Sequence, residues 1–312
     1  MNHKVGLVGF GQMGRNHARV LSKISEIDLI GVYDTNLDKV NKSEYPVASS
    51  LEEISNLSET IVIASSSETH FDLIQYFSEQ NKNILVEKPI SLKINEIESI
   101  YNISEKYNNY IKVGLLEKYN PTINFISKQN LTNFLHINIE RLSPVNQTNR
   151  NSDNVLLDLT IHDFCILKMI TRKKLDEIKF DFYFNKSHPS DHVNIIGHTE
   201  SFSVSITTSK IYQEKKRSVE VLTQNSLYKA NLLKNSVEIS SLNDLSLYKN
   251  KDSYGHIEEI KTSYPVIEYT EPLLAQMKSF LKEVKFKNFK ENRETLNQDL
   301  QLHKFLIDLI QN

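Results

Sequence analysis

Up to about residue 113, short apolar runs alternate with longer amphipathic stretches. The amphipathic stretches have the spacing of helices with one buried face. A regular alternation of strands and helices is typical of a parallel sheet covered on both faces. The pattern therefore predicts a doubly wound α/β domain of the Rossmann type, whose ligands lie at the carboxyl ends of the strands. The expected strands cover residues 4–8, 28–33, 60–64, 84–86 and 110–113.

Beyond Asn120-Pro121, apolar and polar residues alternate with a period of two, which is typical of half-buried strands. We expect a large, mostly antiparallel, open-faced sheet, interrupted early by one helix near Asp158. The stretch 244–264 is polar and is expected to be irregular. The expected strands cover 134–140, 179–184, 192–196, 201–207, 218–222, 226–232 and 237–240, and two helices follow at 272–285 and 293–310.

The change of pattern divides the chain into two expected domains. We expect residues 1–120 to form a Rossmann domain and residues 121–312 to form an α+β domain. We expect Val204 and Ile206 to be exposed on the open face of the second sheet. Exposed apolar patches usually meet a partner, so a homodimer or homotetramer through this sheet is expected.

Composition changes this picture little. Of 312 residues, 39% are apolar and 24% are charged, as in ordinary globular proteins. A net charge of −2 gives no electrostatic case for a nucleic-acid or membrane partner. The single cysteine, Cys165, lies among apolar residues and is expected in the core. No zinc-spaced Cys/His set, leader or membrane span is recognisable, so we expect no metal and a cytoplasmic location.

A glycine-rich turn follows the first expected strand. The segment Gly9-Phe10-Gly11-Gln12-Met13-Gly14 is a G-x-G-x-x-G pattern between a strand and a helix, which is the context that a dinucleotide fingerprint requires. The three glycines allow a tight turn, close approach to a pyrophosphate and close packing of helix on strand. The diphosphate is expected at the N-terminus of the helix, where free N–H groups favour anions.

An acidic residue ends the second expected strand. Asp34 lies twenty residues after Gly14. A carboxylate in this place accepts hydrogen bonds from an adenosine ribose and repels a 2′-phosphate, so NAD is the expected cofactor. The alternative is that Asp34 only starts the turn Asp34-Thr35-Asn36.

An acid and a histidine lie four residues apart in the helix of the second half. Asp158 and His162 would share one face of that helix. Because their neighbours are apolar, the pair would be the polar exception of a buried helix, and buried polar groups need partners. One interpretation makes the pair catalytic. The other makes Asp158 a helix cap and His162 a hydrogen-bonded core residue.

The ordered set of motifs resembles the Gfo/Idh/MocA oxidoreductase family over nearly the whole chain. The matching segments are the glycine turn with His17, the loop Ser65–His70, Glu87-Lys88-Pro89, Asp158-x-x-x-His162 and Glu271–Leu273. Four further segments resemble the branch that oxidises C3 of UDP-N-acetylglucosamine-type sugars. They are residues 114–121, Arg141–Pro144, Arg150 and Asp158–Asp163. Leu115, Lys118, Tyr119 and Ser143 depart from that branch's pattern.

The resemblance implies an NAD-dependent dehydrogenase that oxidises a secondary hydroxyl, at C3, of a sugar, most closely a UDP-N-acetylglucosamine-type nucleotide sugar. It implies catalytic roles for Lys88, His162 and Asp158, with Lys88 held by a cis Lys88–Pro89 peptide. The cofactor-binding residues would be Gly9, Phe10, Gly11, Gln12, Met13, Asp34, Ser65, His70, Glu87 and Lys88. The substrate-binding residues would be Lys88, Glu117, Tyr119, Asn120, Arg150, Asp158 and His162.

Two other functions stay open at this point. One is an inositol or simple hexose dehydrogenase of the same family. The other is a non-catalytic, NAD-bound sensor or assembly protein, against which the joint presence of Lys88, Asp158 and His162 argues.

Overall fold

The structure is a computed structural model that describes residues 2–41, 43–144, 154–242 and 260–311. The chain forms two compact units. Unit 1 contains Met1–Leu116 together with Glu271–Asn312, and unit 2 contains Glu117–Thr270. Within the described ranges, no helix has the length and apolar character needed to cross a membrane.

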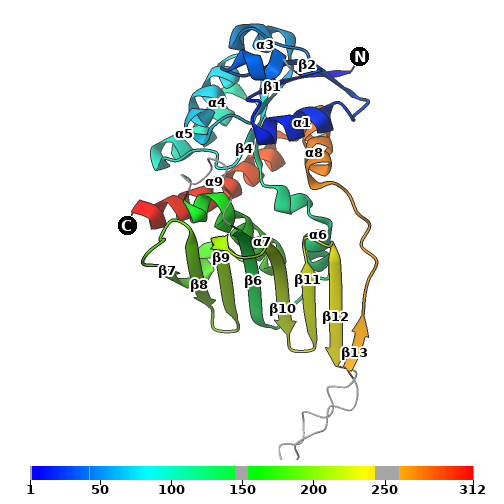
Figure 1. Cartoon of the computed structure of the whole chain (residues 1–312), viewed down its shortest axis with the longest axis vertical. Helices are drawn as coiled ribbons and strands as arrows, with labels where there is room; N and C mark the ends of the chain where they lie inside the picture. The colour runs from blue at the N-terminus through cyan, green and yellow to red at the C-terminus, as the bar shows by residue number, and fades with distance from the viewer. Residues whose placement is uncertain (1, 42, 145–153, 243–259, 312) are drawn as a thin grey trace, which may run out of the picture. The chain divides into compact units, whose positions relative to one another are not determined.

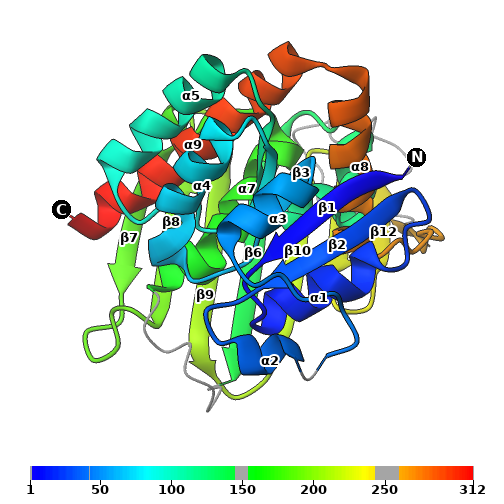
Figure 2. The ribbon, with the colours of Figure 1, turned by 90° about the horizontal axis from the view of Figure 1, so that it is seen from above.

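Unit 1 is built on a five-stranded parallel sheet with the strand order β2-β1-β3-β4-β5. Helices cover the sheet on both faces (Figure 2), which confirms the doubly wound α/β prediction. The strands are β1 (His3–Val8), β2 (Ile27–Tyr33), β3 (Thr60–Ile63), β4 (Asn83–Glu87) and β5 (Ile111–Gly114). The helices are α1 (Gln12–Leu21), α2 (Leu37–Asn41), α3 (Leu51–Leu57), η1 (Ser67–Thr69), α4 (His70–Glu79), α5 (Ile94–Tyr107), α8 (Pro272–Phe286) and α9 (Phe289–Gln311).

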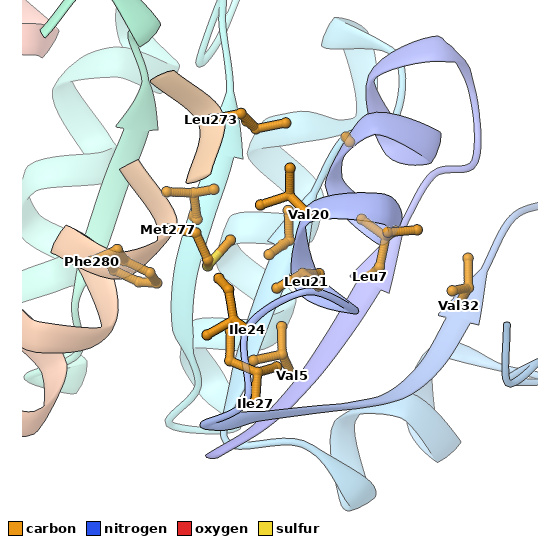
Figure 3. Packing of buried hydrophobic residues seen from close by; sticks show 14 of the residues in the cluster. Val5, Leu7, Val20, Leu21, Ile24, Ile27, Val32, Leu273, Met277 and Phe280 are labelled. Carbon is orange, nitrogen blue, oxygen red and sulfur yellow. The ribbon is translucent and has the colours of Figure 1, made fainter. Parts of the chain in front are cut away.

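The two C-terminal helices belong to unit 1, which differs from the expected division at residue 120. Leu273, Met277 and Phe280 form one stripe of α8 and enter the core beside Val20 and Leu21 of α1 (Figure 3). Helix α9 packs on α5 (Figure 2). An apolar stripe shows that a helix is buried but not against which element, so sequence proximity was a poor guide here.

Unit 2 is built on an eight-stranded sheet with the order β13-β12-β11-β10-β6-β9-β8-β7 (Figure 1). Among the described strands of this second sheet only β6 and β9 pair in parallel, so the mostly antiparallel prediction is confirmed. The strands are β6 (Phe134–Pro144), β7 (Lys179–Phe184), β8 (His192–His198), β9 (Ser203–Tyr212), β10 (Lys216–Thr223), β11 (Ser226–Asn231), β12 (Ser236–Leu242) and β13 (Ile260–Ser263). The helices are η2 (Leu116–Tyr119), α6 (Pro121–Lys128), η3 (Leu156–Thr160), α7 (Ile161–Thr171) and η4 (Leu175–Glu177).

The expectation that Val204 and Ile206 are exposed is wrong. Their side chains are 0% and 1% exposed, because this face of β9 is the one that α7 covers. Asp163 of α7 reaches Thr208, which follows Ile206 on the same face. Alternation predicts that one face is apolar, but it does not say whether a helix of the same chain covers that face.

Candidate active site

The glycine turn has the shape that a diphosphate requires. Gly9 has φ = +93°, and a Cβ there would lie 2.5 Å from the carbonyl carbon of Ala64. A Cβ on Gly14 would collide with the carbonyl oxygen of Gly9, so the third glycine sets the packing of α1 on β1. A Cβ on Gly11 would meet no atom within 4 Å. The first and third glycines therefore build the turn, and the second leaves its outer side open to a ligand.

The N-terminus of α1 lies at this open turn. Gly11 is its N-cap, no side chain caps it, and its first turn carries no acidic residue. Gln12 and Met13 are its first helical residues, so their N–H groups lack intrahelical partners. An anion is favoured there by these donors and by the helix dipole. The residues present thus fit the pyrophosphate of a dinucleotide cofactor.

Asp34 connects the end of β2 to the glycine turn. Its Oδ2 accepts a hydrogen bond from the Phe10 N–H at 2.7 Å, and its Oδ1 accepts one from the Asn36 N–H at 2.8 Å. The Phe10 ring itself is buried in the core, so only its backbone belongs to the turn. A carboxylate offers about four lone pairs, so Asp34 can still accept from a ribose hydroxyl. The turn-starting role and the cofactor role of Asp34 are therefore compatible.

The loops after β3 and β4 are joined by His70. Its Nδ1 donates to the carbonyl oxygen of Pro89 at 2.8 Å, and its Nε2 lies 3.3 Å from the carbonyl oxygen of Ser65. Burial lowers the pKa of the His70 ring, and the contacts to the carbonyl oxygens of Pro89 and Ser65 offset this only in part. The Ser65 hydroxyl is within 2.8 Å of the Thr69 hydroxyl. His70 was predicted to bind the cofactor. Its observed contacts hold the backbone of the loops after β3 and β4 in place.

Glu87 and Lys88 lie at the end of β4. Glu87 is buried, and its Oε1 is 2.7 Å from Nε2 of buried His17 on α1. The pair ties the helix of the glycine turn to the strand that carries Lys88. The Lys88–Pro89 peptide is cis, as expected. Because the strands are parallel, Gly9, Asp34 and Lys88 all follow strands at the same edge of the sheet.

In unit 2, Asp158 and His162 lie in two successive helical segments. Asp158 lies in η3, which is a π-helical turn, and His162 lies in α7. π-Helical turns of this kind are frequent at functional sites. Asp158 forms an ion pair with Lys210 of β9 at 3.1 Å. His162 has its Nδ1 at 4.0 Å from Oε1 of Glu117.

A buried charged network lies beside His162, and the sequence analysis did not identify it. Arg141 of β6 donates through Nε to Asp163 at 2.6 Å and through Nη2 to Glu117 at 2.9 Å, while Thr208 donates to Asp163 at 3.0 Å. Burial lowers the pKa of Arg141, but the two carboxylates more than offset it, so the net shift is upward. Complete burial raises the pKa of Asp163.

A sequence signal for this network existed in the strand alternation. Arg141 has the same parity as Ile137 and Ile139, so the alternation of β6 places its guanidinium on the covered face. An arginine on such a face requires buried acidic partners. Arg217 of β10 lies directly opposite Arg141 and is largely buried as well.

Of the remaining predicted substrate residues, Asn120 and Tyr119 are described by the structure and Arg150 is not. Asn120 is the N-cap of α6: its Oδ1 accepts from the Thr122 and Ile123 N–H groups, and its amide donates to Glu117 at 3.2 Å. Tyr119 lies in η2 next to it. Arg150 lies outside the described residues. Cys165 is buried, as expected.

Comparisons with known proteins agree with this arrangement. Residues 3–115 match the family model described as GFO_IDH_MocA, "Oxidoreductase family, NAD-binding Rossmann fold". UDP-N-acetylglucosamine 3-dehydrogenase from Acidithiobacillus ferrooxidans is 24% identical over 176 residues, which are 54% of this chain and 54% of that protein. Myo-inositol 2-dehydrogenase from Thermotoga maritima is 23% identical over 57% of this chain and 58% of that protein. The matched segments thus span about half the length of these relatives.

The fold resemblance extends over the whole chain. The solved structure of the Acidithiobacillus ferrooxidans enzyme superposes with a TM-score of 0.80, covers 97% of each chain and has 17% sequence identity. At this identity the likeness establishes the fold alone. The family model, in contrast, covers the glycine turn, Asp34 and the Glu87-Lys88-Pro89 segment. Residues 3–115 thus match the NAD-binding Rossmann fold of the Gfo/Idh/MocA oxidoreductase family.

Proposed function

We propose that this chain is an NAD-dependent dehydrogenase that oxidises a secondary hydroxyl, at C3, of a UDP-N-acetylglucosamine-type nucleotide sugar. The observation that carries the proposal lies within unit 1. The open glycine turn, Asp34 and Lys88 share the carboxyl edge of one parallel sheet. A cofactor seated on the turn by its diphosphate therefore has a lysine at the same edge of the sheet, where ligands of such sheets bind.

The chemistry divides between the cofactor and the protein. When bound, the nicotinamide ring accepts the hydride. The hydroxyl proton must leave as well, and His162 is assigned as its acceptor because an imidazole is suited to take a proton near neutral pH. Lys88 is assigned to lower the pKa of the hydroxyl by its positive charge. Asp158 is assigned as a polar contact to the substrate.

The test is a substrate panel with purified protein and NAD. Formation of reduced nicotinamide is followed by its absorbance with UDP-N-acetylglucosamine-type sugars, free hexoses and inositols. We expect turnover with the nucleotide sugars. Turnover with inositol alone would instead identify the second candidate, which the likeness to myo-inositol 2-dehydrogenase favours. No turnover with any member, despite NAD binding, would support the non-catalytic function.

Asp34 is expected to make the protein prefer NAD to NADP. Asp34 follows β2 and accepts from the glycine turn, and a carboxylate in this place of such folds would face the adenosine ribose and repel a 2′-phosphate. Asp34→Ala should weaken NAD binding and narrow the ratio of the two dissociation constants, measured by titration. Asp38→Ala, in α2, changes the charge equally and is the control. Tighter binding of NADP by the unmodified protein would show that Asp34 does not have this role.

We also propose that the chain forms a homodimer or homotetramer through the outward face of the unit 2 sheet. With Val204 and Ile206 buried, the exposed apolar residues of that face include Ile196 and Leu222, which are 43% and 38% exposed. Light scattering at micromolar concentration should give a dimer or tetramer, and Ile196→Asp with Leu222→Asp should shift it toward monomer. A monomeric unmodified protein would contradict this proposal.

A further inference from the structure

The carboxylate of Glu117 is held between an arginine and the histidine assigned as the proton acceptor. Glu117 is 7% exposed. Its Oε1 accepts from Arg141 at 2.9 Å and lies 4.0 Å from Nδ1 of His162, while its Oε2 accepts from Asn120 at 3.2 Å. Both oxygens are therefore engaged by the protein. The resemblance implies that Glu117 contacts the sugar. Its contacts to Arg141, Asn120 and His162 are separate from that expected role.

The position of Glu117 is fixed by groups on rigid elements. Arg141 lies in the sheet, and its Nε donates to Asp163 of α7, which also accepts from Thr208 of β9. The charges alternate along the series Asp163, Arg141, Glu117 and His162. Two arginines, Arg141 and Arg217, and two carboxylates, Asp163 and Glu117, meet in this cluster. The Glu117 carboxylate also faces Nδ1 of His162.

We propose that Glu117 is a positioning residue that holds the His162 ring with Nδ1 toward its carboxylate and favours the protonated ring. The inference rests on the proposed function, in which His162 accepts the hydroxyl proton. With Nδ1 facing Glu117, Nε2 receives that proton, and the electron pair of the broken C–H bond leaves with the hydride to nicotinamide. Glu117 gains no proton. At 4.0 Å it acts by its charge, because a hydrogen bond requires a shorter distance.

The same logic operates in the Ser-His-Asp triad, where a carboxylate orients the imidazole and stabilises the imidazolium that forms. Asp158, four residues before His162, forms an ion pair with Lys210. The other charged groups of the cluster are Arg141, Asp163 and Arg217, and the field at Arg217 includes Asp158, Glu117 and Asp163. Of these groups, the Glu117 carboxylate lies 4.0 Å from Nδ1 of the His162 ring.

The test is the pH titration of the His162 ring by NMR, in the full chain and without cofactor or substrate. The His162 resonance is assigned by its loss in His162→Ala. In Glu117→Gln the midpoint should fall by about one pH unit or more, as expected when an opposite charge within ~4–6 Å is removed. Glu117→Asp keeps the charge farther away and should give a smaller fall. It also provides a readout if the glutamine variant does not fold.

A matched control is available on the same strand. Glu140→Gln removes a carboxylate from the opposite face of β6, where Glu140 pairs with Lys216, and should leave the His162 midpoint unchanged. An unchanged midpoint in Glu117→Gln would overturn the inference, whatever happens to turnover. A fall in the midpoint together with normal turnover of His162→Ala would leave the Glu117–His162 pair established and overturn the proposed function instead.

Discussion

His162→Ala and Lys88→Ala are expected to lower turnover by roughly 10²–10⁴-fold while leaving NAD affinity and melting temperature nearly unchanged. The reason is that each side chain is assigned to the proton that leaves with the hydride. A structural residue would behave differently, because its loss would reduce stability and cofactor binding together. Asp158→Asn should have a milder effect. Steady-state kinetics, NAD titration and thermal unfolding of each variant separate the two patterns.

Exposed residues of the same types are the controls. Lys93→Ala in unit 1 and His188→Ala in unit 2 remove side chains of solvent-facing ion pairs, with Glu96 and Asp191, and should leave turnover unchanged. If His162→Ala turned over the true substrate at a near-normal rate, a residue other than His162 would be the proton acceptor. Tyr119 would then be the next residue to replace.

Arg141→Met is expected to destabilise unit 2 by about 3–5 kcal/mol, the usual cost of removing one partner from a buried ion pair. The methionine fills much of the space, but the carboxylate of Asp163, which is 0% exposed, loses its guanidinium. Its remaining partner is Thr208, which donates a single hydrogen bond. Urea unfolding, monitored by circular dichroism, should show a large drop in the midpoint.

Lys216→Met is the matched control for this loss. It breaks the ion pair with Glu140 in the same sheet, but the two side chains are 45% and 26% exposed, and such pairs contribute at most ~1 kcal/mol. Arg141→Met combined with Asp163→Asn should recover part of the lost stability, because no unpaired buried charge remains at Asp163. If Arg141→Met lowered the free energy of unfolding no more than Lys216→Met does, the buried network would not stabilise unit 2 as proposed.

The Rossmann unit was predictable because its signals are local. The alternation of strand and helix, the glycine turn and Asp34 each depend on a few neighbouring residues, and the structure places them as expected. The sequence did not predict against which element each buried helix face packs. The stripe of Leu273, Met277 and Phe280 was visible, but the surface that it covers lies some 250 residues earlier, on α1.

The candidate site of unit 2 shows a second limit of sequence reasoning. A spacing of four predicts that two side chains share one helix face, but it does not predict their tertiary partners. Asp158 lies in the π-helical turn η3, and His162 follows in α7. Their observed contacts, Lys210 and Glu117, come from β9 and η2. Contacts between distant segments require tertiary packing, which no local pattern specifies.

The return of α8 and α9 to the first sheet has a consequence for folding during synthesis. A ribosome releases Met1–Leu116 first, but the surface formed by Val20, Leu21 and Ile24 remains uncovered until Leu273, Met277 and Phe280 emerge. Unit 2 therefore emerges completely before unit 1 can close, which reverses the usual order in which N-terminal domains fold first. In that interval the nascent chain carries an unfinished apolar surface, and chaperones that bind such surfaces are expected to associate with it.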